Sequence, residues 1–274
     1  MLQPERLRWL AVALTTVALL GTVIAAFGAA PSGMPNVARA FSAAWLAVSL
    51  LGAIAIARWS RIAAYLVGLF ALLVGWRIAG LYGVGLVVYP GAAAFAAYVL
   101  WFFAMARASL AGGGDPALRE MRGSDWHLAF FRLYVGFDFV PHFTEKLFAG
   151  PGPHMEDVEA FQQLGTVAPN ALVWVAGLCE LGAAIGIGLG VLCRLAAVGT
   201  ALYLAIASVT GNHFALGFIW ASPGGGWEYP LLWTVLTVSF VYAGAGRFSI
   251  DGELLRSLDL PGRVRGLMQR GGIG

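Results

Sequence analysis

The sequence predicts an all-α integral membrane protein with eight transmembrane helices, arranged as two tandem four-helix bundles with both termini in the cytoplasm. Hydrophobic types make up 59% of its 274 residues and charged types only 11%, with a mean hydropathy of +0.78. A soluble domain carries about 45–50% apolar and about 25% charged residues, so this class is excluded. The other two observations are a series of long apolar runs and an uneven distribution of arginine between them.

Each predicted helix is an apolar run of roughly 20 residues, the length that crosses the hydrocarbon core of a bilayer. Charges and turn residues bound these runs, which are Trp9–Ala29, Phe41–Ala57, Ile62–Leu81, Val84–Ala106, Trp126–Phe148, Ala171–Val191, Leu195–Leu216 and Tyr229–Ala245. The first run is longer than the apolar region of a cleaved signal peptide, about 7–15 residues, and is therefore predicted as a helix of the membrane domain.

The arginines predict the orientation, because the cytoplasmic flanks of membrane helices are enriched in Lys and Arg. With the N-terminus inside, the inner flanks hold most of the basic residues: Arg6, Arg8, Arg58, Arg61, Arg107, Arg119, Arg122, Arg194, Arg247, Arg256, Arg263, Arg265 and Arg270. The outer side holds Arg39, with Arg77 and Lys146 near its boundary. This asymmetry favours an even number of spans and explains the net charge of +3 without nucleic acid as a partner.

Landmarks shared by the two halves predict a parallel internal repeat. Tyr89-Pro90 precedes Arg107 by the interval at which Tyr229-Pro230 precedes Arg247. An even number of helices in each half makes such a repeat parallel. We expect a degenerate first membrane half at 1–110, a cytoplasmic linker at 111–125, a second membrane half at 126–250, and a basic tail at 251–274 that lies on the anionic inner leaflet.

The second half is where we expect chemistry. All four histidines lie there, whereas no acidic residue occurs between Glu5 and Asp115. Ionisable groups inside a membrane are energetically costly and usually mark function. In the predicted fifth helix a polar stripe runs along one face, formed by Tyr134, Asp138, His142 and Glu145. Pro141 lacks a backbone donor and is expected to open this helix beside Asp138.

Counting the helical rise from each boundary places several polar groups at one zone in the outer half of the membrane. The predicted catalytic residues are Asp138, His142, Glu180 and His213. The predicted substrate-binding residues are Arg132, Tyr134, Glu145, Lys146 and Asn212. The alternative is structural: Arg132 with Asp138, or Lys146 with Glu145 or Glu180, would form buried ion pairs, and the histidines would be neutral and satisfied by carbonyls.

Metal and haem sites are weaker alternatives. A two-His, two-carboxylate set would consist of His142, Glu145, Glu180 and His213, and the two histidines could also hold a haem iron. The sequence has no repeated Glu-x-x-His pair and no Cys-x-x-Cys-His. It also lacks a glycine-rich nucleotide fingerprint, a P-loop and a Cys-x-x-Cys pair. We therefore predict no metal, nucleotide or iron–sulfur site, and haem is disfavoured.

Two other patterns concern packing. The outer loop 149–170 carries apolar residues at helical spacing, which predicts a short helix in the membrane interface: Met155, Val158, Phe161 and Leu164. Gly182, Gly186 and Gly190 recur every four residues, which is typical of close helix–helix packing.

Several motifs in the second half occur together in an ordered series. They are Arg132-Leu-Tyr-Val-Gly136-Phe, Lys146-Leu147, Glu180, Gly190-Val-Leu-Cys-Arg194, Asn212-His213 and Gly244-Ala-Gly246-Arg-Phe-Ser249-Ile-Asp251. In these motifs the stretch from about 125 to 251 resembles the DoxX/DoxD family of four-helix membrane proteins. The resemblance implies an oxidoreductase-associated protein of a prokaryotic plasma membrane, since some members are subunits of thiosulfate:quinone oxidoreductase.

The polar zone and the resemblance together predict an integral, quinone-interacting subunit of a respiratory-type oxidoreductase. Its partners would be membrane lipid and other subunits of the complex, and quinone its redox partner molecule. A histidine beside carboxylates suits quinone reduction, which needs two protons and donors to the carbonyl oxygens. Two alternatives remain open: a non-catalytic membrane anchor or assembly subunit, and a small-solute transporter.

Overall fold

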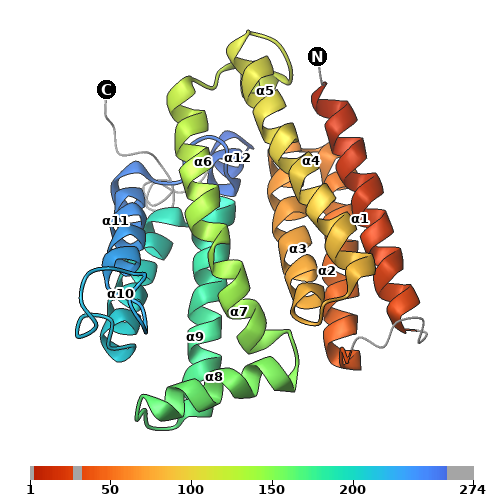
Figure 1. Cartoon of the computed structure of the whole chain (residues 1–274). Coiled ribbons are helices and arrows are strands. Elements are labelled where there is room, and N and C mark those ends of the chain that lie inside the picture. The colour runs from red at the N-terminus through yellow and green to blue at the C-terminus, as the bar shows by residue number, and fades with distance from the viewer. Residues whose placement is uncertain (1–2, 27–32, 258–274) are drawn as a thin grey trace. The chain divides into compact units, whose positions relative to one another are not determined.

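The computed structural model of the chain describes residues 3–26 and 33–257, and every regular element in these residues is a helix (Figure 1). In chain order the elements are α1 (Pro4–Ala26), α2 (Asn36–Ile54), the 3₁₀ turn η1 (Ile56–Arg58), α3 (Arg61–Leu81), α4 (Gly85–Leu110), α5 (Pro116–Arg119), α6 (Gly123–Phe137), α7 (Phe139–Leu147), α8 (Pro151–Gln163), α9 (Pro169–Ala183), the π-helical η2 (Ala184–Gly190), α10 (Cys193–Thr210), α11 (Glu228–Ala243) and α12 (Ile250–Ser257). The prediction of an all-α fold is confirmed.

The chain divides into two compact units. Unit 1 comprises Met1–His127 and Val140–His154, and unit 2 comprises Leu128–Phe139 and Met155–Gly274. The boundaries therefore fall within α6, at the start of α7 and within α8.

Unit 1 contains a four-helix bundle in which α1 to α4 each pack against the next helix and α4 packs against α1. Small residues allow the helices to approach closely: a Cβ atom on Gly52 would lie only 3.0 Å from the backbone nitrogen of Gly68. Across the same contact the buried hydroxyls of Ser42 and Ser49 donate to the carbonyls of Gly75 (2.8 Å) and Gly68 (2.7 Å). These bonds join α2 to α3 where no water competes.

Among the described residues, six helical segments are long and apolar enough to cross a membrane: Pro4–Ala25, Asn36–Arg58, Arg61–Leu81, Gly85–Leu110, Pro169–Gly190 and Cys193–Thr210. They correspond to six of the eight predicted spans. The eighth predicted span is α11, whose 16 residues are fewer than the roughly 20 needed for a full crossing. The structure thus supports a multi-pass protein with six candidate spans, and the count of eight remains a prediction.

The predicted fifth helix, Trp126–Phe148, is interrupted, so the prediction of one continuous helix there is wrong. α6 ends at Phe137 and α7 begins at Phe139, with Asp138 in the turn between them. Pro141 lies in the first turn of α7, where its missing N–H would have no helical partner in any case. The helix is interrupted at Asp138, whereas an opening of the helix by Pro141 stays a prediction. The polar stripe is divided between the two units: Tyr134 and Asp138 belong to unit 2, and His142 and Glu145 to unit 1.

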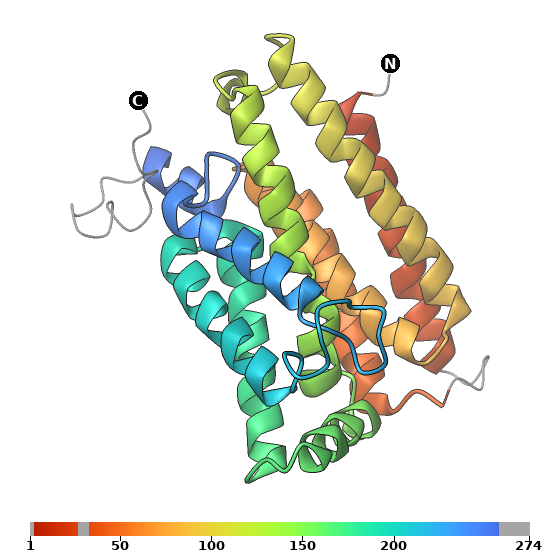
Figure 2. The same ribbon diagram turned by 60° about the vertical axis from the view of Figure 1, so that its left-hand side comes forward.

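In unit 2, α10 packs against both α9 and α11, and Figures 1 and 2 both show α10 and α11 side by side. α6 approaches η2 so closely that a Cβ atom on Gly136 would lie 2.1 Å from the backbone nitrogen of Gly188. Of the predicted glycine stripe, Gly186 and Gly190 lie against neighbouring atoms, while a Cβ atom on Gly182 would meet nothing within 4 Å.

The outer loop and the tail are partly described. α8 forms the short helix predicted within 149–170, with Val158 buried. Of the predicted basic tail, α12 is described up to Ser257. Arg263, Arg265 and Arg270 lie outside the described residues.

Candidate functional site

The turn between α6 and α7 presents the carboxylate of Asp138 within unit 2. The hydroxyl of Tyr229, in the first turn of α11, donates a hydrogen bond to Oδ2 of Asp138. Tyr134, one turn earlier on α6, lies close enough to interact with the same hydroxyl and is 53% exposed. On the next turn of α11, Trp233 stacks on Phe139 with ring centroids 4.5 Å apart. This stacking fixes α11 against the turn that carries Asp138.

Aromatic rings connect Tyr229 to His213. The ring of Trp220 lies 5.3 Å from that of Tyr229 and 5.6 Å from the imidazole of His213. Nδ1 of His213 is 3.3 Å from the carbonyl oxygen of Gly225. Glu228 holds the loop, because its Oε2 accepts from the backbone N–H of Trp220 (3.1 Å). A carboxylate, a phenol and an imidazole thus lie along one series of rings in unit 2, which we call the Asp138–His213 cluster: Asp138, Tyr229, Trp220 and His213.

Asn212 directly precedes His213 in the turn that follows α10. Its φ of 58° is left-handed, a conformation that Asn tolerates better than most residues. The side chain is exposed, and its backbone N–H donates to the carbonyl of Val209 (3.0 Å). Asn212 therefore serves as a turn residue that orients His213.

Glu180 forms a second polar contact within unit 2. The hydroxyl of Tyr203 on α10 donates to Oε1 of Glu180 on α9 (2.6 Å), and the glutamate is only 5% exposed. Asp157 of α8 lies close enough to act electrostatically on the same tyrosine. Buried carboxylates are stabilised by such donors.

Arg132 is completely buried and is held by backbone carbonyls. Its guanidinium donates to Ile187 and Gly188 of η2 and to Phe248 after α11. The π-helical turn leaves carbonyl oxygens directed at a cation, and the guanidinium fork supplies several donors. Arg132 therefore joins α6, η2 and the segment after α11. The described residues show no ion pair between Arg132 and Asp138, which was the structural alternative. Asp138 instead accepts a hydrogen bond from Tyr229.

Asp251 completes this junction in unit 2 at the start of α12. Its carboxylate accepts from the backbone N–H groups of Leu192 (2.9 Å) and Cys193 (3.1 Å), which begin α10. Burial raises the pKa of Asp251 above its ordinary value of 3.8, although these two hydrogen bonds and the nearby Arg132 act in the opposite direction.

The remaining predicted site residues belong to unit 1. Arg77 of α3 forms an ion pair with Glu145 of α7. Nζ of Lys146 donates to the carbonyl of His142 (3.2 Å), and the carbonyl of Lys146 lies 2.8 Å from Nδ1 of His154. The side chain of Lys146 is only 7% exposed, whereas His142 is exposed.

The structure brings together Asp138, Tyr134 and His213 by way of Tyr229 and Trp220, and it holds Glu180 in a separate contact. Sequence reasoning missed both tyrosine partners. Tyr229 stood out only as a landmark of the repeat, and Tyr203 lies within an apolar run. Within the described residues no group of three or more His, Cys, Asp and Glu side chains is placed to hold a metal ion.

Helices of this length and apolarity, several in one chain, define a multi-pass membrane protein. The DoxX family model matches residues 127–213, which confirms the predicted resemblance of the second half. An uncharacterized protein of Haemophilus influenzae is 28% identical over 131 residues, which cover 48% of this chain and 92% of that relative. No solved structure matches the chain.

Proposed function

We propose that the protein is an integral membrane subunit of a respiratory-type oxidoreductase and that unit 2 binds quinone at the Asp138–His213 cluster. The observation that carries this proposal is the hydrogen bond from Tyr229 to Asp138 beside an imidazole and two tryptophan rings. The DoxX match over 127–213 supports it, because the match includes both Asp138 and His213. The site would face the outer half of a prokaryotic plasma membrane, as the arginine distribution favours.

The residues of the cluster suit a quinone for three reasons. The aromatic face of Trp220, which is 44% exposed, can stack on a flat ring. The hydroxyl of Tyr229 can donate to one quinone carbonyl oxygen once it turns from Asp138, and Nε2 of a protonated His213 can donate to the other, since Nδ1 of His213 faces the carbonyl of Gly225. Asp138 accepts a hydrogen bond from Tyr229, so a proton that Asp138 takes up from water could pass to Tyr229 after Tyr229 has given its own to the quinone. Quinone reduction takes up two electrons and two protons, and the electrons would come from a partner subunit or directly from the donor substrate.

The test is quinone content and quinone binding of the purified full-length protein. Extraction should recover quinone in stoichiometric amount, and a short-chain quinone should quench tryptophan fluorescence, since Trp220 and Trp233 lie at the cluster. Asp138→Asn and Tyr229→Phe should each weaken binding by about tenfold, because the first removes the charge of the acceptor and the second removes the donor of the hydrogen bond between them. Tyr242→Phe is the matched control, because Tyr242 lies on the same helix and is 74% exposed.

Equal quinone binding in all of these proteins would contradict the proposal. His142→Ala and Glu180→Gln extend the test, since both residues were predicted to be catalytic. If Glu180→Gln lowers turnover of the intact complex and leaves quinone binding unchanged, Glu180 acts in proton transfer away from the cluster.

A second candidate function is a non-catalytic membrane anchor. The contacts of Arg132 and Asp251 favour it, because both buried charges bind backbone groups and fix packing. An anchor would co-purify with its partner subunit, and the complex would retain full turnover in Asp138→Asn and Tyr229→Phe.

A further inference from the structure

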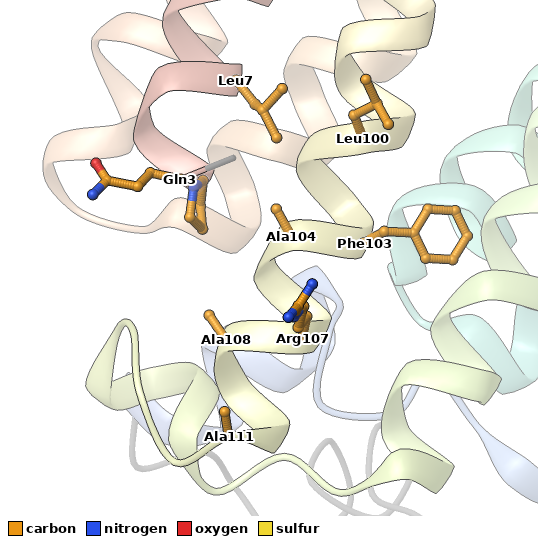
Figure 3. Close-up of a pocket in the computed structure, with 9 residues that line it drawn as sticks. Gln3, Leu7, Leu100, Phe103, Ala104, Arg107, Ala108 and Ala111 are labelled. Atoms are coloured by element: carbon orange, nitrogen blue, oxygen red, sulfur yellow. The ribbon is translucent and has the colours of Figure 1, made fainter. Parts of the chain in front are cut away.

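A groove opens in unit 1 between the first turns of α1 and the last turns of α4, and none of its lining residues takes part in the quinone proposal. Its volume is about 520 Å³, and Figure 3 shows the residues along it. The lining consists of Gln3, Pro4, Leu7, Leu100, Phe103, Ala104, Arg107, Ala108 and Ala111. Ala104 and Ala108 of α4 and Ala111 directly after it leave the space, and the buried Leu7 of α1 lies along it.

The polarity of the groove changes along α4. Leu100 and Phe103, 46% and 52% exposed, lie toward the middle of the helix, and Arg107 lies in its last turn. Seven residues of helical rise separate Leu100 from Arg107, roughly 10 Å along the axis. Arg107 is the single charged side chain among the described residues that line the groove. An apolar channel that ends in one cation matches an amphiphile with an anionic head.

The neighbouring surface on the other side of α1 is also basic. A smaller pocket of about 220 Å³ is lined by Glu5, Arg8, Trp9, Ile54, Ala57, Arg58 and Arg61. Arg8 and Arg61 both bind Glu5, at 2.7 and 2.8 Å, and Arg61 also binds Asp115 at 3.2 Å, so the three guanidinium groups exceed the two carboxylates by one charge. Basic groups at the end of membrane helices attract anionic lipid head groups, each contributing about 1 kcal/mol.

We propose that the groove between α1 and α4 binds an anionic phospholipid, with the phosphate on Arg107 and one acyl chain along Leu7, Leu100 and Ala104. A soluble anion would use the guanidinium and leave the apolar channel empty. A neutral amphiphile would fill the channel and make no use of the charge. A phospholipid uses both features, and it is present wherever membrane helices are.

The test measures lipids retained by the purified full-length protein, by native mass spectrometry, together with its thermal unfolding. Phosphatidylglycerol and phosphatidylcholine with identical acyl chains are the two probes. The protein should prefer phosphatidylglycerol by about fivefold, as one basic contact predicts. Arg107→Gln should remove this preference, and Ala104→Phe should reduce retention of both lipids by filling the channel.

Arg122→Gln is the matched control, because Arg122 is exposed, belongs to the same unit and does not line the groove. It should retain the preference. Equal retention of both lipids, or the same loss in Arg122→Gln as in Arg107→Gln, would overturn the proposal. So would stabilisation by inorganic phosphate alone, or displacement of the lipid by a short-chain quinone. Arg107→Gln changes an exposed side chain, so its unfolding temperature without lipid should match that of the unaltered protein.

Discussion

At the scale of single residues, the buried charges of unit 2 act in two different ways. Arg132 and Asp251 bind backbone groups and join segments that are distant in sequence. Asp138 and Glu180 instead accept hydrogen bonds from tyrosine hydroxyls. A carboxylate paired with a phenol keeps a proton between two groups that can exchange it, whereas an arginine fixed on carbonyls cannot change its protonation state. Arg132 and Asp251 therefore have a structural role, which follows from their backbone partners, and Asp138 and Glu180 are suited to chemistry.

Replacement of Arg132 tests its structural role. Arg132→Met would leave three carbonyls without their donor and should lower the free energy of unfolding by roughly 3 kcal/mol or more. Arg132→Lys should lower the free energy of unfolding by less, because an ammonium group can still donate to these carbonyls. Arg194→Met serves as the control, since its guanidinium donates to one carbonyl, that of Tyr242, at an exposed site; we expect a loss of about 1 kcal/mol or less. Unfolding in mixed micelles measures all three, and a stable Arg132→Met protein that has lost quinone would assign Arg132 to binding instead.

The pH dependence of the free energy of unfolding should reveal the raised pKa of Asp251. Its pKa in the folded protein is raised above the ordinary value of 3.8, so the folded state binds the proton more readily than the unfolded state. Its contribution is therefore fully present below pH 3.8 and is lost as the pH rises through the raised pKa. The stability of the unaltered protein relative to Asp251→Asn should fall across this window. A difference that does not change with pH, or that grows as the pH rises, would contradict the assignment.

At the scale of helices, six of the eight predicted spans correspond to candidate membrane helices in the described residues, because apolar length is a local property of the sequence. The break at Asp138 was signalled by Pro141, but its consequence for packing was not. Which unit α7 joins depends on contacts with residues far away in sequence, such as the pairing of Glu145 with Arg77, 68 positions earlier. The polar residues of the site were recognised because charge is rare in apolar runs. Their tyrosine partners were not recognised, since a tyrosine in an apolar run packs against its neighbours as often as it binds a polar group.

Two glycines of unit 2 make a sharp comparison of helix packing. A Cβ atom on Gly136 would lie 2.1 Å from the backbone nitrogen of Gly188, so Gly136→Ala must push α6 and η2 apart. Backbone atoms cannot move aside as a side chain can, and we expect a loss of at least about 2 kcal/mol. A Cβ atom on Gly182 of helix α9 would meet nothing within 4 Å. Because alanine loses less backbone entropy than glycine when a helix forms, Gly182→Ala should stabilise the protein by about 0.5–1 kcal/mol. Thermal unfolding of both variants measures the effect, and equal behaviour would mean that α6 and η2 are not in close contact.

At the scale of the whole molecule, the segment formed by α6 and α7 decides the topology. Four spans in the first half return the chain to the side of the membrane on which it starts. If the N-terminus lies in the cytoplasm, residues 111–125 therefore lie there too, whether the chain has six spans or eight. If α6 and α7 together cross the membrane, the segment that includes α8 lies outside, as the arginine distribution favours. If they do not cross, this segment lies inside, and a chain with six spans places Ser124 and Val167 on the same side.

Cysteine labelling separates these two topologies. Cys179 and Cys193 are first replaced by serine, and Ser124→Cys and Val167→Cys are then made singly; both positions are exposed, Val167 at 87%. With eight spans, a membrane-impermeant maleimide should label Val167→Cys on intact cells and Ser124→Cys only after lysis. Labelling of both positions only after lysis would establish that α6 and α7 do not cross. The Asp138–His213 cluster could then not face the outer half of the membrane by the predicted route, although its contacts within unit 2 would be unchanged.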